Sequence, residues 1–121
     1  MLERITKDAG PVYHLPGRDW RLCMGPSVSG VKNLTMGVSV FPPGSAPAGH
    51  VHDQEEEVIY CVSGLGELRA PDCTVSLEPG TCVYVPVGLY HATASLGPEP
   101  LELVTAFSPP VVPGSYEAQT K

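Results

Sequence analysis

The sequence predicts an all-β fold, either a sandwich or a barrel. Fourteen Pro and thirteen Gly interrupt the chain so often that no window of about a dozen residues keeps a helical period. Short alternating or apolar runs lie between these turn residues, which is the pattern of strands separated by tight turns. At 121 residues the chain is long enough for one hydrophobic core, so we expect residues 1–121 to form a single domain.

Ten short strands are expected, separated by clusters of turn-forming residues such as PPGS at 42–45, SGLG at 63–66 and EPG at 78–80. The expected strands span residues 12–15, 20–24, 34–41, 50–52, 58–62, 67–70, 74–77, 82–85, 91–95 and 101–107. Strands of this length and spacing are typical of sandwiches and barrels.

Two strands and the C-terminal segment carry further information. Strand 34–41 has one apolar face, which we expect to face the core, and one small, mixed face. The residues of the apolar face are Leu34, Met36, Val38 and Val40. Strand 58–62 is apolar on both faces, so we expect a subunit interface to cover its outer side. The Pro-rich segment 109–121 is expected to be a flexible tail.

The charge balance excludes several classes of partner. The formal charge is −6, and seven Lys and Arg are scattered along the chain, so no basic stripe is available for nucleic acid or an anionic membrane. No apolar run approaches the roughly 20 residues that span a bilayer, and the N-terminus is charged where a signal peptide is apolar. The four cysteines lack CxxC pairs and are expected to pack as reduced, buried thiols. We therefore expect a soluble, cytoplasmic protein.

Three of the four histidines lie in two short segments, HVH at 50–52 and His91. Residues two apart in a strand share a face, so His50 and His52 present both imidazoles to one side, about 7 Å apart along the chain. The acidic triplet 55–57 brings a carboxylate beside this pair, and His91 can approach from another strand. Imidazoles with a carboxylate suit Mn, Fe, Co, Ni, Cu and Zn, and a six-coordinate ion would keep two positions open for substrate.

The spacing of these residues resembles the two sequence motifs of the cupin family. GSAPAGHVHDQEEEVIYCVSG resembles the first motif and GTCVYVPVGLYHATAS the second, with nine of ten defining positions matched. The matching residues are Gly44, His50, His52, Glu57, Gly64, Gly80, Pro86, Gly88 and His91, and Ser95 stands where the family has Asn. The resemblance implies a double-stranded β-helix, or jelly-roll barrel. It also implies that His50, His52, Glu57 and His91 hold one divalent transition-metal ion.

The fourth ligand requires a choice between Glu56 and Glu57, because both fit the permitted spacing after His52. Counting back from Gly64 leaves six residues for Glu57 and seven for Glu56, and six is the spacing of the family motif. Strand alternation agrees, since an inward Glu57 also directs Ile59 and Cys61 inward as an apolar shelf beside the metal. We therefore favour Glu57.

Five residues could assist chemistry at this metal, and each also fits a structural role. Tyr60, Tyr84 and Tyr90 could donate a proton at the mouth of the site, or pack in strands with their hydroxyls in water. Thr93 and Ser95 share strand parity with His91, so they could contact substrate or fill a narrow barrel. Tyr60, Tyr90 and Thr93 are retained as weak catalytic candidates.

The remaining polar candidates are two arginines and one histidine. Arg21 and Arg69 could bind a substrate carboxylate if they faced the cavity, although exposure to solvent is the default for arginine. His14 stands alone in the first expected strand, and we expect it at the surface or a sheet edge.

The resemblance leaves three classes of function open, because cupins include enzymes of several types as well as binding proteins. We favour oxidative, dioxygenase-like chemistry with Mn or Fe on a small oxygen-bearing substrate that chelates the metal. The alternatives are a non-redox metal-dependent isomerase, decarboxylase, dehydratase or lyase, and a non-catalytic small-molecule-binding protein. We also expect a homodimer, because small cupins commonly pair through an outer sheet face.

Overall fold

The computed structural model describes residues 1–112 and 115, and its regular elements within this part of the chain are strands. They are β1 (Val12–Leu15), β2 (Arg18–Met24), β3 (Thr35–Phe41), β4 (Glu56–Ser63), β5 (Gly66–Arg69), β6 (Thr74–Leu77), β7 (Cys82–Val85), β8 (Ala92–Ser95) and β9 (Leu101–Ser108). The predicted all-β class is therefore confirmed. No helix in the described residues is long and apolar enough to cross a membrane.

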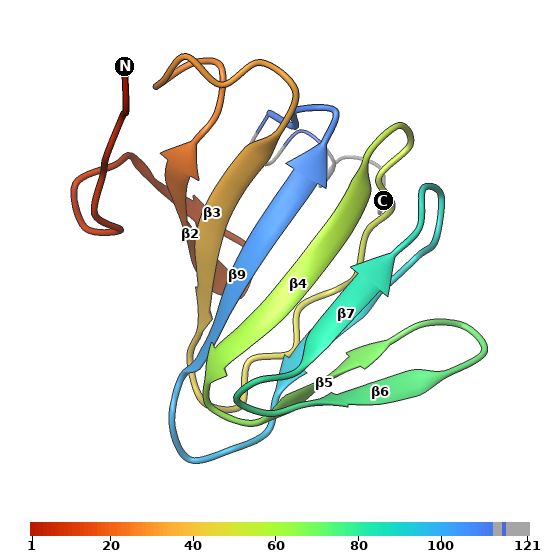
Figure 1. The fold of residues 1–121 in the computed structure, drawn as a ribbon. Coiled ribbons are helices and arrows are strands. Elements are labelled where there is room, and N and C mark those ends of the chain that lie inside the picture. Colours follow the sequence, from red (N-terminus) through yellow and green to blue (C-terminus); the bar gives the residue numbers. More distant parts are fainter. Residues whose placement is uncertain (113–114, 116–121) are drawn as a thin grey trace.

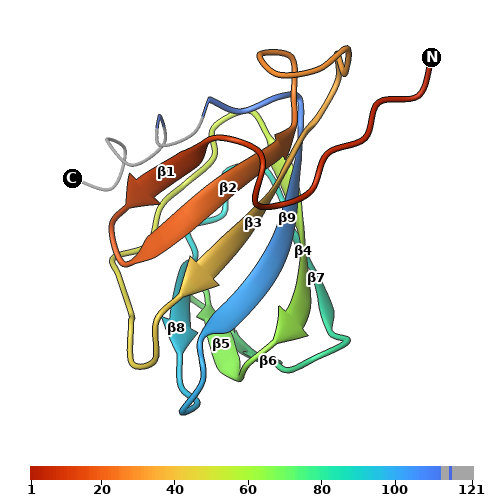
Figure 2. The ribbon, with the colours of Figure 1, turned by 90° about the vertical axis from the view of Figure 1, so that its left-hand side faces the viewer.

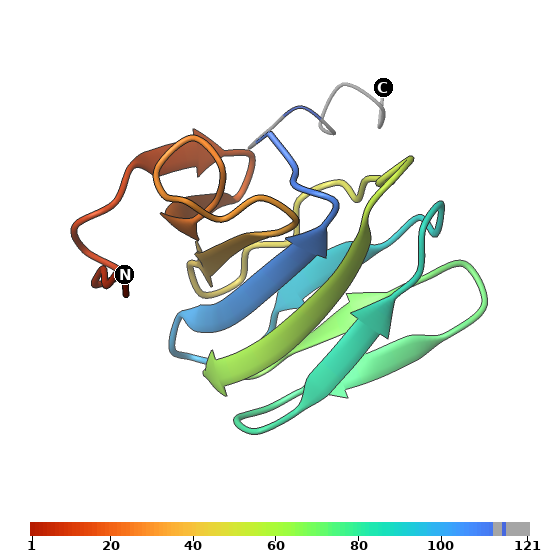
Figure 3. The same cartoon turned by 45° about the horizontal axis from the view of Figure 1, so that its top comes forward.

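The strands form two antiparallel sheets that face each other. The larger sheet has the order β1-β2-β3-β9-β4-β7, and the smaller one has the order β6-β5-β8. Figure 1 shows β3, β9, β4 and β7 side by side, and Figure 2 shows β1 and β2 continuing the same sheet. In Figure 3, β8 and β5 lie on the far side of β9 and β4. This arrangement is the jelly-roll barrel that the sequence motifs implied.

Two clusters of buried apolar side chains fill the interior. Cluster 1 consists of Phe41, Ile59, Cys61, Leu68, Leu77, Val85, Leu101 and Leu103. Cluster 2 consists of Trp20, Leu22, Phe107 and Val111. Each fully buried large apolar side chain contributes roughly 1.5–3 kcal/mol of transfer free energy, so the two clusters supply the main driving force for folding. The site described below lies where these clusters meet, because its cavity has walls from both.

The predicted orientation of strand 34–41 is wrong. Thr35 and Ser39 are buried, at 2% and 5% exposed, whereas Met36 is 37% exposed. The large indole of Trp20 on β2 explains this result, because a Cβ atom at Gly37 would overlap the indole ring. The small face of β3 therefore turns inward to make room for the indole, whose Nε1–H donates a hydrogen bond of 2.9 Å to Thr105 Oγ1.

The predicted strand at 50–52 is also not formed. His50 makes an isolated bridge with His91, in which each backbone N–H donates to the carbonyl oxygen of the other residue at 3.0 and 3.1 Å. The rest of this segment is irregular, and β4 begins at Glu56 instead of at residue 58. The longer β4 places Glu57 within the sheet, opposite Val85 and Phe107.

The structure describes the predicted flexible tail over 109–121 only at residues 109–112 and 115. Val111 is 7% exposed and belongs to cluster 2, and its backbone N–H donates to Thr35 Oγ1 at 3.1 Å. The rest of the predicted tail, at 113–114 and 116–121, lies outside the described residues. The prediction of buried thiols is confirmed for Cys61 and wrong for Cys73 and Cys82, which are exposed.

The outer face of β4 and β7 supports the predicted homodimer, which we propose forms through this face. Val58, Tyr60 and Val62 on β4 are 42–46% exposed, and Tyr84 on β7, opposite Val58, is 59% exposed. Neighbouring exposed apolar side chains of this kind mark interaction surfaces. Sedimentation at micromolar concentration is expected to show a dimer for the natural chain and for a Val75→Glu control, and a monomer for Val58→Glu. A monomeric natural chain would contradict this proposal.

Candidate metal centre

The three histidines reach one point from two segments of the chain. His50 and His52 lie in the connection between β3 and β4, and His91 immediately precedes β8. The backbone N–H of Gly88 donates to the carbonyl oxygen of His52 at 2.9 Å, which ties the first segment to the turn before His91. Gly49 allows the two segments to approach, because a Cβ atom at this position would overlap the carbonyl oxygen of His91.

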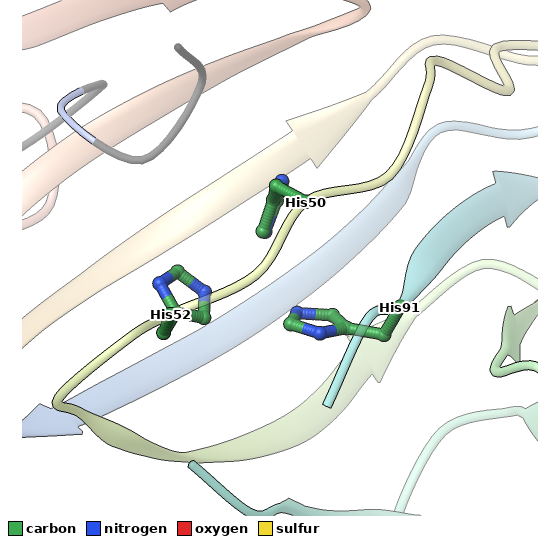
Figure 4. Close-up of side chains that lie close together, drawn as sticks. All are labelled: His50, His52 and His91. Atoms are coloured by element: carbon green, nitrogen blue, oxygen red, sulfur yellow. The ribbon is translucent and has the colours of Figure 1, made fainter. Parts of the chain in front are cut away.

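The imidazoles form a compact group (Figure 4). The ring centroid of His50 lies 4.8 Å from that of His52 and 4.8 Å from that of His91. One nitrogen atom from each ring can be chosen so that all three lie within 4.8 Å of one another. Two nitrogens bound at about 2.1 Å to one ion are about 3.0 Å apart when they are cis and about 4.2 Å apart when they are trans. Small rotations of the imidazole side chains would therefore bring all three nitrogens onto a single ion.

Glu57 joins this group from β4. Its Oε1 atom lies 3.2 Å from Nε2 of His52 and 3.2 Å from Nε2 of His91. The side chain is only 4% exposed, and Oε1 is buried without a hydrogen-bond partner. A cation placed between Oε1 and the imidazole nitrogens would satisfy this oxygen, so the residues fit a metal ion in both donor type and position.

The orientation of the His91 ring is set by a second contact. Its Nδ1 lies 2.9 Å from the carbonyl oxygen of Leu89. Because a carbonyl oxygen can only accept, Nδ1 carries the hydrogen and donates it. This hydrogen bond leaves Nε2 as the basic nitrogen on the side of Glu57, an arrangement that holds metal-binding histidines in their binding tautomer.

Burial and mutual interactions set the charges of these groups. The pKa of His50 falls to about 3, because burial disfavours its charged form and the imidazoles of His91 and His52 oppose a further positive charge. Burial alone would raise the pKa of Glu57, but the imidazoles of His52 and His91 outweigh it and hold that pKa well below its usual range. At neutral pH His50 is therefore neutral and Glu57 is anionic, which are the forms that bind a cation.

The pKa of His91 moves in the opposite direction. Burial lowers it, and the carboxylate of Glu57 outweighs burial and raises it. A proton and a metal ion cannot occupy the same nitrogen of His91. At a pH low enough for His91 to be protonated, metal binding therefore displaces that proton.

The sequence of this chain matches a known protein family. Residues 37–107, more than half of the chain, match the family model of the cupin domain. The chain belongs to the cupin family. This cupin is 26% identical over 107 residues to an uncharacterized protein of Methanocaldococcus jannaschii, and the match covers 88% of this chain and 78% of that protein.

Solved structures with similar folds include two proteins named for enzymatic reactions. One is the polyketide cyclase RemF from Streptomyces resistomycificus, with a TM-score of 0.76 and 19% identity over 89% of this chain and 80% of that one. Another is a predicted oxalate decarboxylase from Thermotoga maritima, with a TM-score of 0.77 and 17% identity over 88% of this chain and 98% of that one. At these identities the likeness shows that this cupin shares their fold.

A small cavity adjoins His50 and His91 of this cupin, with a volume of about 30 Å³ for the centres of water-sized molecules. Most of the surface area of its wall is hydrocarbon, and its apolar side chains are Trp20, Phe41, Ile59, Leu103 and Phe107. Its polar wall comes from His50, Glu57, His91, Arg18, Ser39, Thr93 and Thr105. A compact molecule can therefore contact the histidines while surrounded mainly by hydrocarbon.

The structure separates the weak catalytic candidates. Thr93 is half-buried and lines the cavity. Tyr60 and Tyr84 are exposed on the outer face of the larger sheet. Tyr90 is 43% exposed and does not line the cavity, and its hydroxyl oxygen accepts a hydrogen bond of 3.1 Å from the backbone N–H of Gly49. Ser95 is buried, outside the cavity wall, and its Oγ has no hydrogen-bond partner.

The charged candidates are also placed clearly. Arg69 pairs with Glu67 on the same strand at 2.6 Å, and Arg21 lies 3.8 Å from Asp8. His14 pairs with Asp19 at 2.7 Å on the surface, as expected for this histidine. None of these side chains lines the cavity.

The arginine that does line the cavity is Arg18, which sequence reasoning missed. It is 7% exposed and opens β2, two residues before the predicted start of that strand. The available signal was strand alternation, because Arg18 shares a face with Trp20 and Leu22, which are both buried in cluster 2.

Proposed function

We propose that this cupin is a metalloenzyme that holds one divalent transition-metal ion through His50, His52, Glu57 and His91. The proposal further assigns oxidative, dioxygenase-like chemistry on a small oxygen-bearing substrate. The observation that carries it is the convergence of three imidazoles and one carboxylate, of which His52, Glu57 and His91 are buried and His50 is half-buried, beside a largely apolar cavity. Three imidazoles with one carboxylate suit Mn, Fe, Co, Ni, Cu and Zn, and we favour Mn(II) or Fe(II) because the proposed chemistry is oxidative. Two positions of a six-coordinate ion then remain for substrate.

Each side chain has a definable task in this proposal. A bound Mn or Fe ion supplies Lewis acidity and a site for dioxygen activation. Glu57 provides negative charge that offsets the charge of the cation, and His91 is held in its binding tautomer by the carbonyl oxygen of Leu89. Trp20, Phe41 and Phe107 provide the aromatic part of the cavity wall. The Thr93 hydroxyl lies in the cavity wall, where it can donate a hydrogen bond to a substrate oxygen.

A non-redox reaction is the second candidate, and the names of the similar structures favour it. One is called a polyketide cyclase and the other a predicted oxalate decarboxylase. In that case the ion would polarise a carbonyl group while a neighbouring base moves a proton, as isomerases, decarboxylases, dehydratases and lyases require. The same four donors and the same cavity serve both candidates, so the reaction itself must distinguish them.

Dioxygen consumption is the test of the oxidative proposal. Tag-free protein, stripped of metal and reloaded with Mn(II) or Fe(II), is to be assayed with phenols, diketones and oxo acids. We expect metal-dependent consumption of dioxygen coupled to substrate loss, and none from the His52→Ala variant. Substrate turnover under strict anaerobiosis would replace oxidative chemistry with the non-redox candidate. Tight substrate binding without turnover under either condition would indicate a binding protein.

A further inference from the structure

Arg18 is a buried cation in the cavity of the proposed metal site. Its side chain is 7% exposed, and it lines the same cavity as His50, Glu57 and His91. Arginine is rarely this buried, because removing the guanidinium from water costs free energy unless polar groups compensate. Nη1 of Arg18 donates a hydrogen bond of 2.9 Å to the carbonyl oxygen of Pro16, and this bond holds the guanidinium at the cavity wall.

The balance of charge in the cavity indicates what such an arginine can bind. Among the side chains in the cavity wall, Arg18 carries +1, Glu57 carries −1, and His50 and His91 are neutral when they bind metal. These charges cancel, so the +2 of a divalent ion remains uncompensated in a largely apolar space. Coulomb attraction is strong where water is scarce, so the metal-loaded cavity favours an anion.

The position of Arg18 indicates from which side an anion could reach the proposed metal. Besides the cavity at the histidines, Arg18 lines a hollow of about 420 Å³ on the surface. The rest of its lining is Leu15, Gly17, Val40, Pro42, Pro43, Pro100 and Asp19, whose carboxylate pairs with His14. Arg18 therefore stands between the surface and the proposed metal. A guanidinium at such a point can receive an anionic group and hold it by two parallel N–H···O bonds, which match the geometry of a carboxylate.

We propose that Arg18 is the substrate-recognition residue of this site and that the substrate is a small carboxylate anion. This inference rests on the proposed metal centre and extends it by naming the substrate class. Arg18 contacts the carboxylate, and the remaining oxygen atoms of the substrate face the metal. The 30 Å³ of the inner cavity restricts the part of the molecule beside the histidines to a few heavy atoms.

The experiment compares Arg18→Met, Arg18→Lys and an Arg21→Met control. Arg21 is the neighbouring arginine on β2, lies outside the cavity wall and pairs with Asp8. Each protein is loaded with Mn(II), and oxalate binding is measured by calorimetry. We expect Arg18→Met to weaken oxalate binding by about 10- to 100-fold. Arg18→Lys is expected to weaken it less, because lysine keeps the positive charge but lacks the planar guanidinium. Arg21→Met is expected to leave oxalate binding unchanged.

The Mn(II) affinity of each variant is the second readout. We expect Arg18→Met to bind Mn(II) at least as tightly as the natural chain, because the substitution removes a positive charge beside the cation. We expect Arg18→Lys, which keeps the charge, to bind it about as tightly as the natural chain, and retained Mn(II) binding also shows that both variants are folded. If Arg18→Met does not fold, Arg18→Lys decides, and an unchanged oxalate affinity in it overturns the proposal. Equal oxalate affinity in the natural chain and Arg18→Met, or no oxalate binding by the natural chain, also overturns it.

A separate result would show that the proposed metal centre itself is wrong. If the natural chain takes up no Mn(II), the proposed metal centre is wrong, and the anion site is judged on oxalate binding to the metal-free protein. Weaker binding by Arg18→Met in that state supports Arg18 as the anion-binding residue, and equal binding rejects it.

Discussion

Replacing His52 with alanine is expected to lower the affinity for Mn(II) by more than about 100-fold. Loss of a hydrogen-bond partner behind a metal ligand typically costs 10- to 100-fold in metal affinity, so loss of the ligand itself should cost more. His52 is 2% exposed and lies 3.2 Å from the Glu57 carboxylate, so its imidazole is shielded from solvent on the side of the proposed metal. The measurement is a competition titration of the metal-free protein with a chelator of known affinity.

His14 provides a matched control for this variant. It is the same residue type, its side chain is 79% exposed, and it pairs with Asp19 on the surface. We expect His14→Ala to bind Mn(II) as tightly as the natural chain. Equal Mn(II) affinity in the two variants would show that His52 is not a ligand. A circular dichroism spectrum of each variant shows whether it is folded, so that a loss of affinity can be assigned to the missing ligand.

The second large effect is expected from Glu57→Gln, which should weaken Mn(II) binding by about 100-fold. The substitution keeps the shape of the side chain and removes the anionic oxygen that lies 3.2 Å from Nε2 of both His52 and His91. An amide oxygen is a poorer ligand than a carboxylate, and its neutral charge leaves the charge of the cation uncompensated in a buried site. The same titration measures the change.

Glu56 is the control for Glu57 and resolves the choice between the two adjacent glutamates. Glu56 lies on the exposed, opposite face of β4, and its carboxylate raises the pKa of the Tyr84 hydroxyl by accepting a hydrogen bond from it. We expect Glu56→Gln to leave Mn(II) affinity within about twofold of the natural chain. A larger loss in Glu56→Gln than in Glu57→Gln would reverse the assignment.

The histidine pair could be predicted from short-range spacing, and the resemblance to the second cupin motif implied that His91 joins it. The HVH segment fixes His50 and His52 two residues apart, and the PVG turn places His91 at the start of a strand. Strands β1, β6 and β7 also begin and end where the sequence predicts, since Pro, Gly or Asp residues flank them closely. Local signals of this kind survive folding, because the turns that they encode are formed by the same few residues.

The direction of β3 could not be predicted, because it depends on contact between distant residues. The alternation of β3 alone favours the face of Met36 as the buried one. The opposite face is chosen because the indole of Trp20 occupies the space above Gly37 and donates a hydrogen bond to Thr105 on β9. Such packing between strands outweighs the apolar pattern of a single strand.

Arg18 was missed for a related reason. A strand predicted to begin at residue 20 leaves residue 18 in a turn, where an arginine is expected to be solvated. The ladder between β1 and β2 extends to the pair formed by Leu15 and Arg18, so strand alternation carries Arg18 inward with Trp20. Errors of two residues at strand ends are ordinary, and here one of them concealed an arginine in the wall of the cavity beside the proposed metal.

The coordination of one metal ion by three imidazoles and one carboxylate is the central claim, and X-ray absorption at the Mn K edge tests it most directly. Tag-free protein is to be loaded with one equivalent of Mn(II). The account predicts a first shell of nitrogen and oxygen atoms together with the multiple-scattering signal of three imidazole rings, and loss of about one ring in His52→Ala. A shell of oxygen atoms alone, without imidazole scattering, would contradict it.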